Sequence, residues 1–478
     1  MNKLLLGVLL LCTMALATPT ASFLDAEPVS AVPASIIYNL YATDGFTKLA
    51  DGTPLYTYGF VGGEQGQSFS YMNSLGAVVT LPNGPPAPTG GPRTAAEAPL
   101  AGNAQLPAPV MWATVGDTVI INLKNLGTTL KKAPNDPHTI HLHGVDVDAA
   151  NDGVPETSVA AVPANAVAPG AGNVVVYMFT ASSPGTYMYH CHQEASIHVQ
   201  MGMYGALVVY NQGDAAAASR TLGPNSGFGG SLFGFNYDKD AIMLLSEIDV
   251  RQHTSEQAGA GGVTPFNPVN YQPQYWMING LSFPNTIHAG VGFVWANWEM
   301  THKGYDPLIT GSVSAGQKVL LRTINLGFET QPMHVHGFHP KVIGSDQRAW
   351  SWAHTDKTLG AGLEKNTITI GSGETYELLF DFAQQRQTST YQPGTQSRYS
   401  AAGPQSNTAT ANPPIPDPFT PPQTYIGGPA VAGVVGGTAL GIPFQTSQFF
   451  PFHNHDDYKA TNNGVYPGGQ FTFVVPLP

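Results

Sequence analysis

The chain is poor in cysteine, poor in charge and, beyond its first residues, has no long apolar run. It has two cysteines, and because Cys12 lies in an apolar leader, Cys191 is the only thiol expected in the mature chain. Charged residues make up 10% of the sequence without a basic patch, which argues against a nucleic acid as partner. A membrane span is not expected, because no later segment offers the roughly 20 apolar residues that one needs.

Glycine and proline are abundant instead. The 54 glycines and 40 prolines predict many short strands joined by loops, and little helix. Residues 1–17 have the pattern of a secretory signal peptide: Lys3, an apolar run, then Ala15-Leu16-Ala17 as a cleavage site. We therefore expect an all-β protein that is exported, to the periplasm or the extracellular space.

The single thiol lies in an unusual setting. Cys191 stands between His190 and His192, and His198 and Met203 follow closely. A lone buried cysteine is commonly an inert small hydrophobe, but that interpretation does not explain the clustered histidines. A thiolate, two imidazoles and a weak axial thioether are the ligands of a blue-copper electron-transfer site. The stretch therefore predicts a copper site.

The chain also repeats itself. Four features occur twice in the same order: a strand with an Asn-Leu-Gly turn, a His-x-His-Gly, a second His-x-His, and a Gly-x-Tyr segment before a final strand. The paired segments are 115–127 with 315–327, 141–144 with 334–337, 190–192 with 453–455, and 202–205 with 464–467. One matched strand would mean little, but the ordered histidine pairs predict a duplicated β-domain.

This repeat predicts the domain boundaries. After the signal peptide we expect a first domain at 35–212, a linker at 213–235 and a second domain at 236–478. Residues 82–108 and 383–447 are predicted loop insertions in the first and second domain. Each domain is expected to be a β-sandwich whose residues alternate between inside and outside.

These motifs resemble the multicopper oxidases, specifically a two-domain, laccase-like type built from cupredoxin domains. The resemblance covers roughly 112–210, 316–345 and 450–470, and it implies two Greek-key β-sandwiches with long loop insertions. It also implies a type 1 copper bound by His138, Cys191 and His198, with Met203 as axial ligand and Met201 as the competing candidate. The step from Cys191 to His198 is two residues longer than in common laccases, so the connecting loop is expected to differ.

The resemblance further implies a trinuclear copper cluster. His141 and His334 would bind type 2 copper, and the type 3 pair would be bound by His143, His190, His192, His336, His453 and His455. Together with type 1 copper, this gives four copper ions per chain. The second domain would lack a type 1 site, because internal alignment places Gln331, Asn454 and Val465 where His138, Cys191 and Met203 stand.

Three residues are predicted to act in the chemistry. Cys191 would carry electrons from type 1 copper to the cluster, because its neighbours are both cluster ligands. Asp152 and Glu194 resemble acids that the family places near the cluster, where dioxygen reduction consumes protons.

The predicted function is an oxidase that couples one-electron oxidation of a phenol-like reductant or metal ion to reduction of dioxygen to water. The family layout implies a homotrimer whose clusters form between subunits. Two alternatives are a copper nitrite reductase, which His143, His192 and His455 argue against, and a non-enzymatic copper-binding electron-transfer protein.

Overall fold

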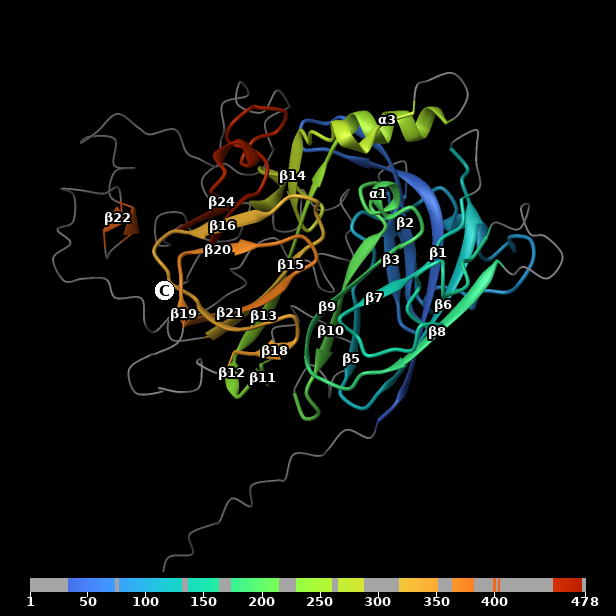
Figure 1. Ribbon diagram of the computed structural model, residues 1–478, viewed down its shortest axis with the longest axis horizontal. Coiled ribbons are helices and arrows are strands. Elements are labelled where there is room, and N and C mark those ends of the chain that lie inside the picture. The colour runs from blue at the N-terminus through green and yellow to red at the C-terminus, as the bar shows by residue number, and fades with distance from the viewer. Residues whose placement is uncertain are drawn as a thin grey trace, which may run out of the picture.

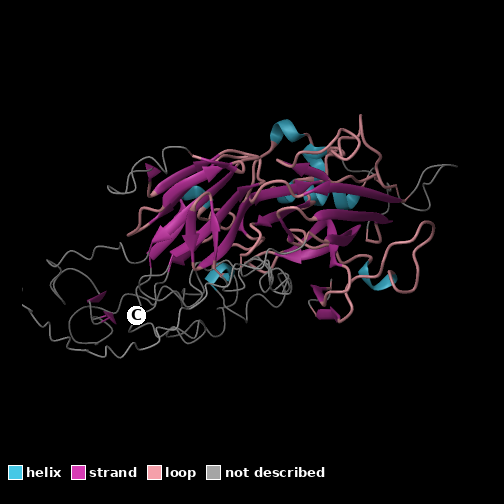
Figure 2. Cartoon of the chain, turned by 90° about the horizontal axis from the view of Figure 1, so that it is seen from below, coloured by secondary structure: helices cyan, strands magenta, loops and turns pink. Residues whose placement is uncertain are grey.

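The computed structural model contains two β-sandwiches side by side (Figures 1 and 2). It describes residues 33–73, 77–130, 136–162, 173–214, 229–259, 265–287, 318–350, 363–381, 399–400, 403–404 and 450–474. Within these ranges strands predominate, and the longest helix, α3 (Val250–Ala258), has 9 residues. The predicted all-β class with two sandwich domains is therefore confirmed.

The first sandwich packs two four-stranded sheets, ordered β2-β1-β6-β8 and β5-β10-β9-β7. Strands β1 and β6 run parallel, whereas β6 and β8 are antiparallel, as expected where the chain crosses between the two sheets. Its elements are β1 (Ser35–Lys48), β2 (Pro54–Glu64), β3 (Phe69–Met72), β4 (Val78–Leu81), η1 (Ala98–Leu100), β5 (Met111–Thr114), β6 (Thr118–Gly127), β7 (His141–His143), β8 (Val174–Thr180), β9 (Gly185–His190), α1 (Ala195–His198) and β10 (Tyr204–Tyr210).

The second sandwich packs the sheet β14-β13-β15-β21-β17-β18, with β19 paired to β17, against the sheet β20-β16-β24-β25. Its elements are β13 (Lys239–Ile248), α3, η3 (Pro268–Asn270), β14 (Tyr275–Ile278), η4 (Asn285–Ile287), β15 (Lys318–Asn325), β16 (Gln331–Val335), β17 (Lys341–Ser345), β18 (Arg348–Ala349), β19 (Leu363–Glu364), β20 (Thr367–Ile370), β21 (Thr375–Asp381), β24 (Phe450–Asn454), η8 (Asp457–Lys459) and β25 (Phe471–Val474). Two further strand pairs form separate two-stranded sheets: β11 (Gly230–Leu232) with β12 (Phe235–Tyr237), and β22 (Tyr399–Ser400) with β23 (Gly403–Pro404).

The two sandwiches repeat the same strand pairings. The order β2-β1-β6-β8 in the first corresponds to β14-β13-β15-β21 in the second, with the parallel pair in the same place. The Asn-Leu-Gly segments share the same hydrogen bond, because the Asn125 side chain accepts from the Gly127 amide at 2.9 Å and Asn325 accepts from Gly327 at 2.9 Å. The predicted turn at 125–127 is instead the end of β6, where the pairing with β1 shifts register. The duplication seen in the sequence is therefore a duplication of topology.

The sandwiches meet along a buried interface that is mostly apolar. One hydrophobic cluster joins residues of β9 and β10, such as Met188 and Tyr204, to residues of β13 and β15, such as Leu244 and Ile324. A buried ion pair of the second domain lies at the same interface: Arg322 Nε is 2.8 Å from Asp240 Oδ2, which also accepts from the Tyr210 hydroxyl of the first domain at 2.9 Å. The two domains are thus fixed to each other through their cores.

Several predicted segments are only partly covered by the described residues. The signal peptide at 1–17 lies outside them, as does nearly all of the 383–447 insertion and residues 215–228 of the linker. The 82–108 insertion is described, and it packs its Glu97 carboxylate against Lys124 of β6 at 2.7 Å. No helix in the described part of the chain is long and apolar enough to cross a membrane.

Candidate metal centre

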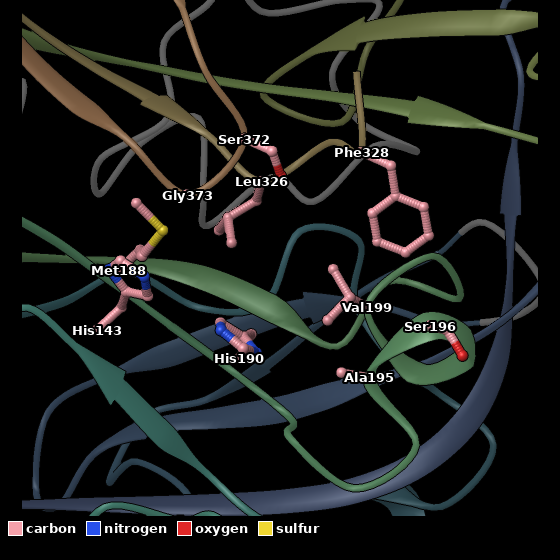
Figure 3. A pocket seen from close by; sticks show the side chains of 10 residues that line it. All are labelled: His143, Met188, His190, Ala195, Ser196, Val199, Leu326, Phe328, Ser372 and Gly373. Carbon is pink, nitrogen blue, oxygen red and sulfur yellow. The ribbon is translucent and has the colours of Figure 1, made fainter. Parts of the chain in front are cut away.

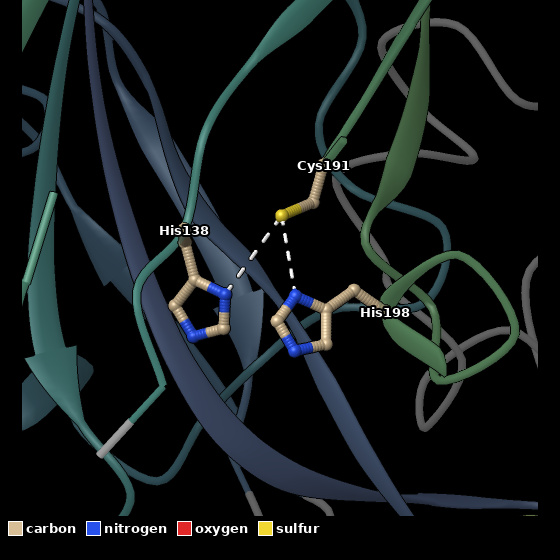
Figure 4. Close-up of side chains that lie close together, drawn as sticks. All are labelled: His138, Cys191 and His198. Atoms are coloured by element: carbon tan, nitrogen blue, oxygen red, sulfur yellow. Dashed lines mark hydrogen bonds between the residues drawn. The ribbon is translucent and has the colours of Figure 1, made fainter. Parts of the chain in front are cut away.

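Three predicted ligands converge inside the first sandwich (Figure 4). Cys191 Sγ lies 3.3 Å from His198 Nδ1 and 3.9 Å from His138 Nδ1. These three ligand atoms all lie within 4.8 Å of one another, and all three residues are buried. Among the described residues, this is the one group of three or more histidine, cysteine or acidic side chains close enough together to hold a metal ion.

The surroundings of the thiol suit a bound metal more than a free thiol. Burial raises the pKa of Cys191 to about 11, so the bare side chain is a neutral thiol. The Thr139 amide nevertheless points at Sγ from 3.4 Å, as a donor does toward a thiolate. A soft cation would favour the ionised form, since thiolate ligation releases the proton. A sulfur and two imidazole nitrogens around one point therefore fit copper.

The loop between Cys191 and Met203 is closed by backbone hydrogen bonds. The short helix α1 begins after Glu194, whose carbonyl accepts from the His198 amide at 3.0 Å. The Met203 amide then donates to the His198 carbonyl, and the Cys191 amide donates to the Met203 carbonyl, both at 3.0 Å. The longer step predicted from Cys191 to His198 is thus accommodated by one helical turn. Met201 and Met203 are both fully buried.

The two predicted acids lie in different settings. Asp152 lies beside His141, whose Nδ1 is 2.7 Å from the Asp152 carbonyl and 3.2 Å from its carboxylate Oδ1. Glu194 has an exposed side chain and a left-handed backbone with φ of 44°. Asp152 therefore orients a predicted cluster histidine directly, whereas the Glu194 contacts just described are made by its backbone.

Four histidines group at one edge of the first sandwich. Strand pairing places His141 opposite His190, and the His141 ring centroid lies 5.1 Å from that of His190 and 5.2 Å from that of His192. Burial lowers the pKa of His190 to about 3 and also lowers that of His143. These imidazoles are therefore neutral, which is the form that binds metal.

The second domain repeats this group at its own edge. His334 pairs with His453, and the ring centroid of His334 lies 4.8 Å from that of His336 and 5.0 Å from that of His455. His336 and His455 are exposed. The ring contacts found among described residues join histidines of the same domain, so the eight predicted cluster ligands form two separate groups of four.

A cavity of about 390 Å³ lies between the two domains (Figure 3). His143, Met188 and His190 line it from the first domain, and Leu326 and Phe328 face them from the second. Gly373 also borders it, at a φ of +81° that favours glycine. The cavity therefore gives two predicted cluster histidines an apolar, partly enclosed neighbourhood.

The second domain has amides where the first has the thiol site. The register places Gln331 and Asn454 at the positions of His138 and Cys191, as the sequence comparison predicted. The counterpart of Met203 is different. Tyr204 pairs with His190 and Phe471 pairs with His453, so the residue before each, Met203 or Gln470, occupies the same position. The predicted match of Val465 to Met203 was wrong, because the Gly-x-Tyr similarity at 464–466 lies in a loop before the strand.

The sequence did not identify three further residues near these sites. Glu247 is buried and hydrogen-bonded to Gln331, His253 of α3 is buried against the first domain, and Gln347 contacts the glycine that follows His143. Each is far along the chain from the residue it contacts. A buried acid in a strand is the one feature of the three that sequence alone offers as a signal.

The multicopper oxidase family model matches residues 87–213 and 285–387. Copper resistance protein A of Escherichia coli is 25% identical over 323 residues, which are 61% of this chain and 46% of that protein. Laccase-2 of Cryptococcus neoformans var. grubii is 26% identical over 58% of this chain and 40% of its own length. The chain thus spans less than half the length of these curated relatives.

Solved structures share the fold. The blue copper oxidase from Nitrosomonas europaea aligns with a TM-score of 0.50 at 20% identity, covering 92% of this chain and 85% of its own. The multicopper oxidase mgLAC gives the same score and identity over 93% and 86%. The predicted cupredoxin-type Greek-key sandwiches agree with both. With its ordered histidine pairs, its thiol site and these matches, the chain belongs to the multicopper oxidase family.

Proposed function

We propose that this protein is a laccase-like oxidase that takes single electrons from a reductant and passes them to dioxygen, forming water. The convergence of Cys191, His138 and His198 on one buried point carries the proposal, because that donor set suits copper and electron transfer. The reductant is a phenol-like compound or a metal ion. Bound copper would supply the redox chemistry, with four ions per chain: one type 1, one type 2 and two type 3.

The residues around these sites have distinct roles in this proposal. His138, Cys191 and His198 would hold type 1 copper, with Met203 as axial ligand, while Cys191 joins that site through the backbone to His190 and His192. His141 and His334 would hold type 2 copper, and the type 3 pair would be held by His143, His190, His192, His336, His453 and His455. Neutral imidazoles, favoured by burial of His143 and His190, keep these nitrogens available.

Protons for water formation would pass by the two acids. The carboxylate of Asp152 lies 3.2 Å from His141, which holds this ring in place and keeps an acid beside the cluster. Glu194, exposed at the start of α1, would exchange protons with solvent. Asp152→Asn is therefore expected to slow dioxygen reduction more than reductant oxidation.

The two separate groups of four histidines support assembly between copies of the chain. In one chain each group holds half of a cluster, and the group in the second domain is partly exposed. We propose a homotrimer in which the first domain of one subunit meets the second domain of its neighbour, since a head-to-tail contact closes a ring. The proposed domains are 35–212 and 236–478, joined by 213–235, in a protein exported by residues 1–17.

Copper content and oxygen uptake test this proposal together. Copper-loaded protein is expected to contain four ions per chain, to be blue, and to consume one dioxygen for four electrons taken from a phenolic dye. Two ions per chain with nitrite reduction would instead identify a nitrite reductase. A blue protein without oxygen uptake would identify an electron-transfer protein. A monomer that carries a complete coupled copper pair would contradict assembly between subunits.

A further inference from the structure

A buried polar cluster fills the place in the second domain where the first has its thiol site. Gln331, Asn454 and Gln470 are completely buried, and Glu247 of β13 is 1% exposed. Burying one carboxyl and three amides is costly unless each finds partners. No catalytic step proposed above uses them, so what they contribute must come from the contacts that they make.

The hydrogen bonds of this cluster run in one direction. Glu247 Oε2 accepts from Gln331 Nε2 at 2.7 Å, and Gln331 Oε1 accepts from Asn454 Nδ2 at 2.7 Å. The same Asn454 nitrogen donates to Gln470 Oε1 at 2.7 Å. The Glu247 carboxyl oxygens accept at every contact found for them, including two backbone amides, so Glu247 sets the direction in which Gln331 presents its amide, and Gln331 in turn sets that of Asn454.

The two amides lie on the strands that carry the histidines. Gln331 begins β16, three residues before His334, and Asn454 ends β24 between His453 and His455. The Gln331–Asn454 bond therefore ties β16 to β24 beside their pair His334 and His453. A shift of either amide would move the imidazoles on both strands.

Glu247 is itself held firmly from the other side. Its Oε1 accepts from the Tyr271 hydroxyl at 2.9 Å, from the Glu329 amide at 3.1 Å and from the Phe328 amide. Gly327 makes room for it, because a Cβ there would lie 1.9 Å from Glu247 Oε2. The carboxylate thus connects the loop after β15 to the start of β16.

The first domain has a shorter acid in the corresponding place. Asp44 of β1 accepts from the Thr129 amide at 2.8 Å and the Leu130 amide at 2.7 Å, in the loop that follows its own Asn-Leu-Gly turn. Asp44 is one methylene shorter than Glu247, and its bonds go to this loop and to Tyr56 rather than to His138. In the first domain this acid therefore holds the loop and does not bond the residue that corresponds to Gln331.

We propose that Glu247 is a positioning residue for the histidines of the second domain. Its carboxylate holds Gln331 and Asn454 together, as type 1 copper would hold His138 and Cys191 together in the first domain. The role assigned to the histidines rests on the function proposed above. The tie from Glu247 through Gln331 to Asn454 does not, because it consists of hydrogen bonds between side chains of the protein itself.

Exchanging the carboxyl and amide groups of positions 247 and 331 tests the direction of this row of hydrogen bonds. Glu247→Gln alone sets two amide donors against each other, and Gln331→Glu alone sets two carboxyls together. The double variant restores both hydrogen bonds, because the new amide at 247 donates to the new carboxylate at 331, which accepts from Asn454. In copper-free protein each single change should raise the unfolding equilibrium constant about tenfold, and the double variant should recover most of this loss.

In copper-loaded protein the same series should show where the effect lies. The single variants are expected to lose at least half of their type 3 near-ultraviolet absorption while keeping the blue type 1 absorption, and the double variant should regain it. Glu247→Asp, which copies Asp44, should keep the loop bonds but lose the bond to Gln331, and so behave as the single variants do. Glu377→Gln is the matched control, because this buried carboxyl accepts from the Thr186 amide and not from Gln331. The stability lost in Glu377→Gln should therefore simply add to the stability lost in Gln331→Glu.

The proposal would be overturned if the stability losses of Glu247→Gln and Gln331→Glu simply added in the copper-free double variant. Full type 3 absorption in every single variant would also overturn it. Coupled losses in the copper-free cycle together with a wild-type protein that lacks a type 3 pair would instead contradict the proposed oxidase function. If a single variant fails to fold, the Glu247→Asp variant still decides, because it removes the tie to Gln331 without placing like groups together.

Discussion

The two domains place different chemistry on the same backbone. At three matched positions the first carries His138, Cys191 and Met203, and the second carries Gln331, Asn454 and Gln470. The strand order and register around these positions are the same. The fold therefore does not by itself determine which domain holds the proposed type 1 copper; in this proposal the side chains at three positions do.

The comparison also separates the jobs of neighbouring residues. Both domains keep a His-x-His on the strand that carries the central residue, with the first imidazole Nδ1 near the carbonyl of that central residue, at 3.1 Å in one and 2.8 Å in the other. Only the central residue differs, Cys191 against Asn454. The histidines are thus common to both halves of the proposed cluster, and the sulfur is particular to one domain.

The largest expected effect removes this difference. Cys191→Ser should abolish the blue absorption and reductant oxidation, because a serine hydroxyl does not replace a thiolate as copper ligand. Asn454→Cys should not create a second blue site, since Gln331 and Gln470 are not copper ligands. Absorption spectra of copper-loaded proteins check both. A blue Cys191→Ser protein would contradict the assignment of the type 1 site.

A second test asks whether the interface holds the two domains as one unit. Arg322→Met leaves Asp240 buried without its cation, so we expect unfolding to become easier by about 3–5 kcal/mol. Lys318→Met is the control at a neighbouring but half-exposed pair, 3.7 Å from Asp381, where a loss of about 0–1 kcal/mol is expected. Urea unfolding measures both. Equal losses would mean that the buried pair has no special part in joining the domains.

The sequence was informative where short-range patterns carry the signal. Alternating strands, Asn-Leu-Gly segments and His-x-His pairs predicted the duplicated sandwich, and the resemblance to multicopper oxidases implied that His138, Cys191 and His198 converge. It failed where position depends on register, since Val465 resembled Met203 by its Gly-x-Tyr neighbours but Gln470 occupies the place. Glu247 contacts Gln331 across 84 residues, and no local pattern encodes such a contact.

A smaller effect follows from an acid at the domain interface. Burial raises the pKa of Glu377 to about 7, and its Oε1 accepts from the Thr186 amide of the first domain at 3.2 Å. The folded protein therefore binds this proton more tightly than the unfolded chain. The resulting stability is fully present below about pH 4.5 and is lost as pH rises through 7, on the order of 2–3 kcal/mol.

Urea unfolding across this pH window should show the loss, and Glu377→Gln should reduce it, because an amide does not titrate. Burial also raises the pKa of Glu247 to about 7, so this second acid should keep part of the slope. An unchanged slope in Glu377→Gln would assign the pH dependence to another group.

The smallest expected effect concerns the hairpin tip by which the second domain touches the first. Gln347 has a left-handed backbone with φ of 61°, and its side chain donates to the Thr186 carbonyl and lies against Gly144 and Gly185. Gln347→Ala should cost about 1 kcal/mol through the lost hydrogen bond. Gln347→Gly loses the same bond but relieves a backbone conformation that costs roughly 1 kcal/mol outside glycine, so it should be the more stable of the two. If the alanine variant is instead as stable as wild type, the hydrogen bond from Gln347 to Thr186 does not hold the domains together.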